Sequence, residues 1–203
     1  NGNPLNKLIV GGGVISNHLW NAISESECHA YQTFGMTETI SHIAMRRVSN
    51  ELTNYRILPG VEIAVKEGCL SINAPDLGVE NLHTNDEVEI YEDGSFKWLG
   101  RKDFVINSGG IKIHPEVIED KLEGLIQQPF FAIGLPDDTF GEKLILCIEG
   151  DSSILKSELE TCLNKFYIPK YVYFFDEFSR TASGKINRLK TIERIADAKK
   201  QVL

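Results

Sequence analysis

Three polar side chains of this sequence have the chemistry to act on a phosphate group. Thr37 and Glu38 follow a predicted strand that ends at Gly35, so a hydroxyl and a carboxylate stand together at a turn. Such a pair can contact phosphate oxygens and a magnesium ion, because magnesium is usually held by few carboxylates together with substrate phosphates. Lys185 lies in a polar loop beside Gly184. A mobile loop of this kind could bring a cation to a phosphate that gains negative charge during a reaction.

Further candidates for a nucleotide site are three consecutive glycines and an isolated acid. Gly11, Gly12 and Gly13 follow a short apolar run, and residues without side chains let the backbone approach a flat ligand closely. Asp86 ends a β-like segment, where an acid can accept hydrogen bonds from a ribose diol.

Each signal also has a plainer structural alternative. Thr37 could cap a polar turn, and the glycines, which do not match G-x-G-x-x-G, could form an ordinary turn. Asp86 and Lys185 could be solvated surface residues, as most such residues are. Taken singly, these residues leave both interpretations open.

A movable boundary is predicted in residues 100–119. Arg101 and Asp103 place a base and an acid two positions apart, and the pair Gly109-Gly110 follows a short apolar run. Pro115 can then begin a helix, because its fixed φ suits the first helical turn. Charged residues at a joint, followed by backbone without side chains, indicate a hinge beside a ligand site.

The part before this boundary is expected to be rich in strands. A helix capped by Ser16 should run to about Ser24. Asp93-Gly94 between apolar runs predicts a hairpin, and Lys66-Glu67-Gly68 predicts another turn. The expected strands cover residues 8–10, 29–34, 61–65, 69–72, 88–91 and 96–99.

Strands and helices alternate after the boundary, as in a small α+β domain. The helix from Pro115 should place Ile118 and Leu122 on one face with Leu125, and a second helix should bury Leu155, Leu159 and Leu163. A terminal helix is expected over residues 192–198, and strands over residues 130–135, 143–149 and 171–175. The fold class expected is therefore α+β / α/β, with one domain over residues 1–102 and a second over residues 103–203.

Composition excludes several classes of function. The formal net charge of −8 argues against general nucleic-acid binding, and no apolar run is long enough to span a bilayer. The four cysteines form no C-x-x-C pair, which favours buried thiols in a reducing, cytoplasmic setting. Cys28 beside His29 is a weak metal candidate, because adjacent ligands without a second pair rarely form a site.

Taken in order, the motifs resemble the adenylate-forming acyl-CoA synthetase superfamily. They are Gly-Gly-Gly, Phe-Gly-Met-Thr-Glu, Thr-Asn-Asp, Gly-Arg-Lys-Asp with Gly-Gly-Ile-Lys, and Arg-Thr-Ala-Ser-Gly-Lys-Ile-Asn-Arg, and they extend from about Val10 to Arg188. Members of this superfamily activate a carboxylic acid with ATP and then transfer the acyl group to a thiol, usually that of coenzyme A. The resemblance implies the tail of a β-rich AMP-binding domain followed by a small mobile domain.

The resemblance also implies a role for each candidate residue. Lys185 would reach the α-phosphate and the acyl carboxylate, Thr37 would contact phosphate, and Glu38 would hold Mg2+. Asp103 would be the hinge. The adenine and acyl pocket would be lined by Gly11, Gly12, Gly13, Tyr31, Gln32, Thr33 and Phe34, the ribose would be bound by Asp86 and Arg101, and coenzyme A would pass Gly109 and Gly110.

Two departures from the superfamily pattern stand out. The usual Thr-Gly-Asp reads Thr84-Asn85-Asp86, and we expect Asn85 to tolerate the left-handed backbone of that turn. The Ser/Thr/Gly-rich phosphate loop that normally lies upstream is not found in the chain, which begins with Asn1. We therefore expect a C-terminal fragment that adenylates poorly alone and needs the N-terminal part of the enzyme as its partner.

Within the superfamily the chain looks most similar to o-succinylbenzoate–CoA ligases of menaquinone biosynthesis. The similarity lies in the string from Gly35 to Ala44, where His42 could contact a polar acyl tail or could be an ordinary strand histidine. The alternatives are a half-protein that binds nucleotide or coenzyme A with a partner chain, another acyl-CoA ligase, or a peptide-synthetase adenylation domain.

Overall fold

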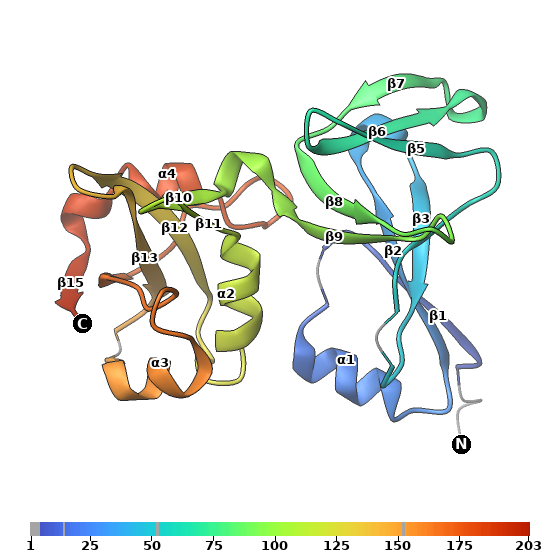
Figure 1. The fold of residues 1–203 in the computed structure, drawn as a ribbon. Coiled ribbons are helices and arrows are strands. Elements are labelled where there is room, and N and C mark those ends of the chain that lie inside the picture. Colours follow the sequence, from blue (N-terminus) through green and yellow to red (C-terminus); the bar gives the residue numbers. More distant parts are fainter. Residues whose placement is uncertain (1–4, 14, 52, 152) are drawn as a thin grey trace. The chain divides into compact units, whose positions relative to one another are not determined.

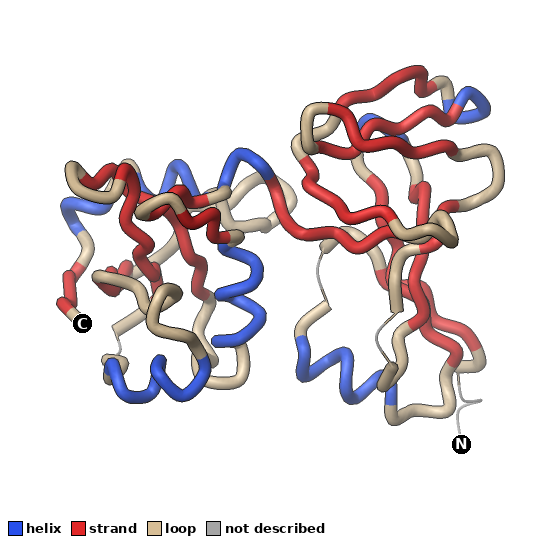
Figure 2. Tube along the Cα trace, viewed as in Figure 1, coloured by secondary structure: helices blue, strands red, loops and turns tan. Residues whose placement is uncertain are grey.

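The computed structural model describes residues 5–13, 15–51, 53–151 and 153–203. The chain forms two compact units, Asn1–Asp103 and Phe104–Leu203, so the division falls one residue after the expected boundary (Figure 1). Strands are the main element of both units (Figure 2).

Unit 1 begins with a mixed four-stranded sheet in the order β1-β2-β3-β4. The strands are β1 (Lys7–Val10), β2 (His29–Gly35), β3 (His42–Arg47) and β4 (Arg56–Ile57). The pair β1–β2 is parallel, and α1 (Asn17–Ser24) makes the crossover between them. As predicted, Ser16 caps α1 through its hydroxyl, which accepts from the Leu19 amide at 3.2 Å. Trp20 and Ile23 of α1 pack on a small core of Ile15, Ala30 and Val48.

The rest of unit 1 consists of antiparallel strands around a second core. A three-stranded sheet contains β5 (Glu62–Lys66), β6 (Cys69–Ala74) and β7 (Val79–His83), and a hairpin contains β8 (Asp86–Ile90) and β9 (Phe96–Arg101). The rings of Phe34, Tyr55 and Phe96 meet in this core with centroids 5.3–5.5 Å apart. Single 3₁₀ turns are η1 (Thr37–Thr39), η2 (Pro75–Leu77) and η3 (Lys102–Phe104).

Unit 2 contains a six-stranded sheet with a hydrophobic core on each face. The strands are β10 (Ile106–Ser108), β11 (Ile111–Ile113), β12 (Phe130–Asp137), β13 (Gly141–Glu149), β14 (Tyr171–Phe175) and β15 (Lys199–Val202). One face packs on α2 (Pro115–Leu122) and α3 (Lys156–Cys162) through Ile118, Leu122 and Leu159. The other face is covered by Phe178, Ile186 and Ile192, where α4 (Arg188–Ile192) and the 3₁₀ turn η4 (Ile195–Asp197) follow one another.

Three details of the predicted elements are wrong. Residues 192–198 do not form one helix, because α4 ends at Ile192 and the chain then enters β15, which pairs with β14. Leu155 is 62% exposed, because it precedes the first turn of α3 instead of lying on its buried face. Asn85 is not among the described residues with positive φ, so the expected left-handed turn is not formed there.

Candidate functional site

The glycine run and the β2 motif meet at the carboxyl ends of two parallel strands. A Cβ atom on Gly11 would lie 2.6 Å from Oγ1 of Thr33, a distance that leaves room only for glycine. Gln32 is buried, and its Nε2 donates to the Gly13 carbonyl at 3.0 Å. The carboxyl ends of parallel strands commonly border ligand crevices. The structure therefore brings two motifs about twenty residues apart in sequence into one place.

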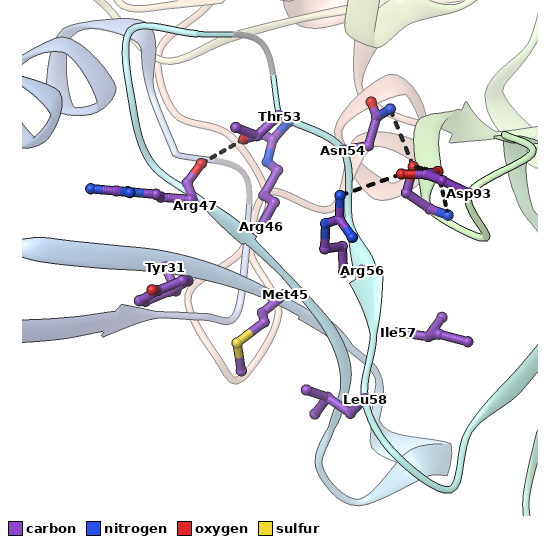
Figure 3. A pocket seen from close by; sticks show the side chains of 11 residues that line it. Tyr31, Met45, Arg46, Arg47, Thr53, Asn54, Arg56, Ile57, Leu58 and Asp93 are labelled. Atoms are coloured by element: carbon purple, nitrogen blue, oxygen red, sulfur yellow. Dashed lines mark hydrogen bonds and ion pairs between the residues drawn. The ribbon is translucent and has the colours of Figure 1, made fainter.

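The four residues from Tyr31 to Phe34 do not share one face of β2. Successive side chains of a strand point to opposite faces, so Tyr31 and Thr33 face one side while Gln32 and Phe34 face the other. The ring of Phe34 packs against Tyr55 and Phe96 in the core. Phe34 thus helps to anchor the strand, whereas Tyr31 lines an open pocket (Figure 3).

This pocket of about 490 Å³ carries several cations, most of which have partners within unit 1. Arg56 pairs with Asp93 at 3.4 Å (Figure 3), and Arg46 donates to Gln32 at 2.8 Å. The hydroxyl and amide of Ser95 hold the pKa of Asp93 below its ordinary value. The pocket is lined by Tyr31, Met45, Arg46, Arg47, Thr53, Asn54, Arg56, Ile57, Leu58, Asp93 and Ser95.

Thr37 and Glu38 are exposed on the single turn η1, directly after β2. Thr39 stabilises the turn. It is fully buried, and its hydroxyl oxygen accepts from the Met36 amide at 3.1 Å. Ile40 follows with φ 61°, a strained conformation for a β-branched residue, and its side chain is 84% exposed. Sequence reasoning missed Thr39 and Ile40.

The Glu38 carboxylate fits a magnesium ion that is completed by substrate oxygens. Among the described residues, no group of three or more His, Cys, Asp or Glu side chains gathers into a metal cluster. Magnesium does not need such a cluster, because it commonly uses one or two carboxylates with phosphates and water. His42 lies close by, since it is the register partner of Gly35 across β2 and β3.

Asp86 and Arg101 lie opposite each other in the pairing of β8 with β9. The Asp86 Oδ1 atom accepts from the Trp98 indole at 2.8 Å, which fixes the carboxylate. Arg101 donates to Asp103 at 2.8 Å, and Asn85 donates to the same Asp103 oxygen at 3.1 Å. The two residues expected at the ribose and the residue expected at the hinge therefore form one connected cluster. The contributions of Asn85 and Trp98 were not predicted.

In unit 2, Gly109 and Gly110 form the tight turn between β10 and β11. Their φ angles are 58° and 81°, values that favour glycine. The Gly109 amide donates to the Phe140 carbonyl at 2.9 Å, and a Cβ atom on Gly109 would lie 3.2 Å from the Phe140 ring. Phe140 is half exposed, so this turn presents bare backbone beside an aromatic surface.

Lys185 lies on a short hairpin formed by residues 179–187. Arg180 bridges Ile186 as an antiparallel pair, and the Thr181 amide donates to the Lys185 carbonyl at 2.8 Å. Gly184 closes the turn with φ 82°. The lysine side chain is exposed. In the part of the chain that the structure describes, its ammonium group makes no hydrogen bond or ion pair.

The cysteines form no disulfide in the structure, where all four lie within the described residues and are free thiols. Cys69 and Cys147 are buried, and burial raises the pKa of the Cys147 thiol far above its ordinary value, so it stays protonated.

No described helix has both the length and the apolar character needed to cross a bilayer.

Comparison with known proteins relates the chain to curated ligases by sequence and to solved structures by fold. No protein-family model matches the chain. The 2-succinylbenzoate–CoA ligase of Lactococcus lactis is 31% identical over 208 residues, covering 92% of this chain and 46% of the relative. The same ligase of Listeria monocytogenes is 28% identical over 214 residues, covering 92% of the chain and 45% of the relative. The chain thus spans less than half the length of these curated relatives, and matches their C-terminal part.

Solved structures show the same fold. The o-succinylbenzoate CoA synthetase of Bacillus subtilis, in complex with ATP and a magnesium ion, superposes with a TM-score of 0.78 at 22% identity and covers 92% of this chain and 46% of that chain. ATP-bound MatB from Rhodopseudomonas palustris gives a TM-score of 0.73 at 21% identity, covering 94% and 46%. The expected fold class is confirmed.

Proposed function

From the premise that this chain has the sequence and fold of the C-terminal part of the adenylate-forming acyl-CoA synthetases, we propose that it belongs to an ATP-dependent acid–CoA ligase. A carboxylate oxygen of the acid attacks the α-phosphorus of ATP, the bond to the bridging oxygen breaks, and pyrophosphate leaves with the electron pair. The sulfur of coenzyme A then attacks the acyl carbon, the bond from that carbon to the phosphate oxygen breaks, AMP leaves with the electron pair, and the thiol proton passes to solvent. The product is an acyl-CoA thioester.

The observation that carries this proposal is that the candidate residues lie on two compact units. Unit 1 carries Thr37 and Glu38 on η1, after the strand whose Gln32 and Thr33 contact the glycine run, and unit 2 carries Lys185 on its hairpin. The division between the units follows Asp103 directly. Two reactions at one pocket can be served by two poses of a hinged domain.

The residues of unit 1 would bind the nucleotide. Gly11, Gly12 and Gly13 would lie along the adenine, and Asp86 and Arg101 would bind the ribose hydroxyls. Thr37 would donate to a phosphate oxygen. Glu38 would hold the magnesium ion, which neutralises charge on the phosphates when it is bound.

The residues of unit 2 would act in turn. In the adenylating pose the Lys185 ammonium would stabilise the negative charge that develops at the α-phosphate. In the thioester-forming pose the turn at Gly109 and Gly110 would replace it and admit the thiol arm of coenzyme A. Asp103 would absorb the backbone rotation between the poses.

The open surface of the first sheet supports the need for a preceding part of the enzyme. Within the described residues, β1 is an edge strand of a parallel pair, and its Ile9 side chain is 61% exposed. Parallel strands are normally buried on both faces, so the face that carries Ile9 is suited to a further layer. We propose that the N-terminal part of the ligase supplies this layer together with the phosphate loop.

The acid is proposed to be o-succinylbenzoate, with His42 near its polar tail. The support is that the relatives from Lactococcus and Listeria are named 2-succinylbenzoate–CoA ligases. The test is a set of carboxylic acids offered with ATP, Mg2+ and coenzyme A to the longest natural protein that contains this chain, with release of pyrophosphate as the readout. We expect o-succinylbenzoate to be preferred over benzoate and over aliphatic acids.

Two other results would be informative. Preference for an aliphatic acid would reject the substrate while keeping the ligase. No pyrophosphate with any acid, from a natural protein that begins near Asn1 and carries no phosphate loop, would favour a half-protein that binds nucleotide or coenzyme A with a partner chain.

A further inference from the structure

The hairpin that carries Lys185 is short, and its own hydrogen bonds do not fix where its base lies. Two arms, residues 179–181 and 185–187, are joined by the Thr181-to-Lys185 bond and by a bond from the Asn187 amide to the Ser179 carbonyl at 2.7 Å. An isolated two-stranded hairpin is at best marginally stable in water. The direction in which Lys185 projects must therefore depend on contacts between the base of the hairpin and the body of unit 2.

Thr191 provides a contact that reaches both arms. It lies one turn beyond the hairpin in α4 and is fully buried. Its hydroxyl oxygen accepts from the Ser179 amide at 3.1 Å on the first arm, and the same hydroxyl donates to the Asn187 carbonyl at 2.9 Å on the second arm. A threonine hydroxyl has one hydrogen to donate and free lone pairs to accept, so both capacities are used here.

Other contacts hold the first arm from outside. Glu149, at the end of β13, accepts from the Phe178 amide and from the Arg180 guanidinium, each at 2.6 Å. Arg194 donates to the Ser179 hydroxyl at 3.3 Å. These bonds hold the first arm against the body of unit 2, but they make no contact with the second arm.

The second arm is anchored by the residue that follows it. Arg188 forms a bidentate pair with Glu119 of α2, with both N–O distances 2.8 Å, and also donates to the Ala132 carbonyl at 3.2 Å. Thr191 therefore stands between two arms that are each tied to the body of unit 2. The backbone bond between Ser179 and Asn187 sets the separation of the arms, and the Thr191 hydroxyl is placed to hold this base against α4 and so to set the direction of Lys185.

We propose that Thr191 is a positioning residue for Lys185, acting through the base of the hairpin. This inference rests on the proposed function, in which Lys185 serves adenylation. Removing the hydroxyl leaves the partly buried Ser179 amide without its acceptor, whereas the Asn187 carbonyl keeps its bond from the Thr191 amide at 3.0 Å. We expect the first arm of the hairpin to become more mobile while unit 2 remains folded.

The test compares Thr191→Val, which keeps the shape but loses the hydroxyl, with Thr191→Ser, which keeps the hydroxyl. The matched control is Thr161→Val, which removes a hydroxyl that donates to the Glu158 carbonyl in α3. In the 203-residue chain, amide exchange of residues 179–187 should accelerate about tenfold in Thr191→Val, as expected for the loss of one hydrogen bond worth about 1 kcal/mol. It should stay unchanged in the serine variant and in the control.

In the longer ligase, Thr191→Val should lower kcat for adenylate formation about tenfold or more, because small misplacement of a catalytic group is costly. Transfer to coenzyme A from preformed adenylate should stay within about twofold, since Lys185 is withdrawn in that pose. Equal loss of both half-reactions, or no rescue by serine, would overturn the inference. If Lys185→Ala leaves adenylation intact, the proposed function itself fails; if Lys185→Ala abolishes adenylation while Thr191→Val does not slow it, the inference alone fails.

Discussion

Arg101 and Asp103 form an ion pair of 2.8 Å across the last three residues of unit 1, and Asn85 donates to the same carboxylate oxygen. The residue expected to be the hinge is therefore bonded to a residue expected to bind the ribose. Both side chains are about half exposed, so the pair itself adds little stability. The pair instead links the two proposed roles, because a nucleotide that bound the Arg101 guanidinium would compete with Asp103 for it.

The first prediction concerns this hinge. Asp103→Pro fixes φ at residue 103 and disfavours the helical conformation of Lys102 in η3. We expect the ratio of the two half-reactions to change by at least about tenfold, because one pose of unit 2 is trapped. Asp103→Ala is the control, since it removes the bonds to Arg101 and Asn85 but leaves φ free. Wild-type rates of both half-reactions in the proline variant would show that the hinge lies elsewhere.

The second prediction concerns the metal. Glu38→Gln keeps the shape of the side chain but removes its charge, so the magnesium concentration for half-maximal adenylation should rise at least about tenfold. The control is Glu80→Gln, which neutralises an exposed carboxylate of β7. A magnesium dependence that is unchanged in Glu38→Gln would remove Glu38 from the proposed site.

The third prediction concerns the partly buried pair of Glu119 and Arg188. Burial raises the pKa of Glu119, while Arg188 and the Ala132 amide oppose that rise. Glu119→Gln removes the charge that faces the guanidinium and should lower the free energy of unfolding of the chain by about 1–3 kcal/mol in urea titration. Replacing both residues with leucine should cost less than the sum of the two single changes. Additive costs would mean that the pair is not coupled.

The fourth prediction concerns acid stability. The hydrogen bond from Lys170 to Asp137 at 3.2 Å, followed by the Thr139 amide at 3.1 Å, holds the pKa of Asp137 below its ordinary value of 3.8. A carboxylate with a lowered pKa in the folded state stabilises that state above its ordinary pKa, and this stabilisation is lost as the pH falls through the ordinary value toward the lowered one. Asp137→Asn should therefore lose less stability than wild type between about pH 5 and pH 3.

Melting temperatures across that range would check the effect. Asp138→Asn is the matched control, because Asp138 is the exposed neighbour in sequence. If the asparagine variant at 137 shows the same acid dependence as the wild type, the Lys170 bond does not form in solution.

Local signals in the sequence predicted much of the fold. The Ser16 cap and the hairpin around Asp93-Gly94 depend on neighbouring residues, and both are confirmed. The terminal helix expected over residues 192–198 was wrong because α4 ends at Ile192, residues 195–197 form only a 3₁₀ turn, and the chain then pairs with β14, a partner about thirty residues away that local propensity does not report. The same limit applies to the sites. Thr191 lies outside the motifs, and Thr39 lies inside one without an assigned role, because the contacts that make both residues important exist only after folding.

The central claim is that Lys185 serves adenylation and not thioester formation. The most direct measurement is the rate of each half-reaction in Lys185→Ala of the longer ligase, with Lys190→Ala, which removes an exposed lysine of α4, as the control. We predict that Lys185→Ala lowers adenylate formation by at least about 100-fold, because a positioned charge is lost at the transition state. Transfer from preformed adenylate to coenzyme A should remain near the wild-type rate. Equal loss of both half-reactions, or an unchanged rate of adenylation, would contradict the account.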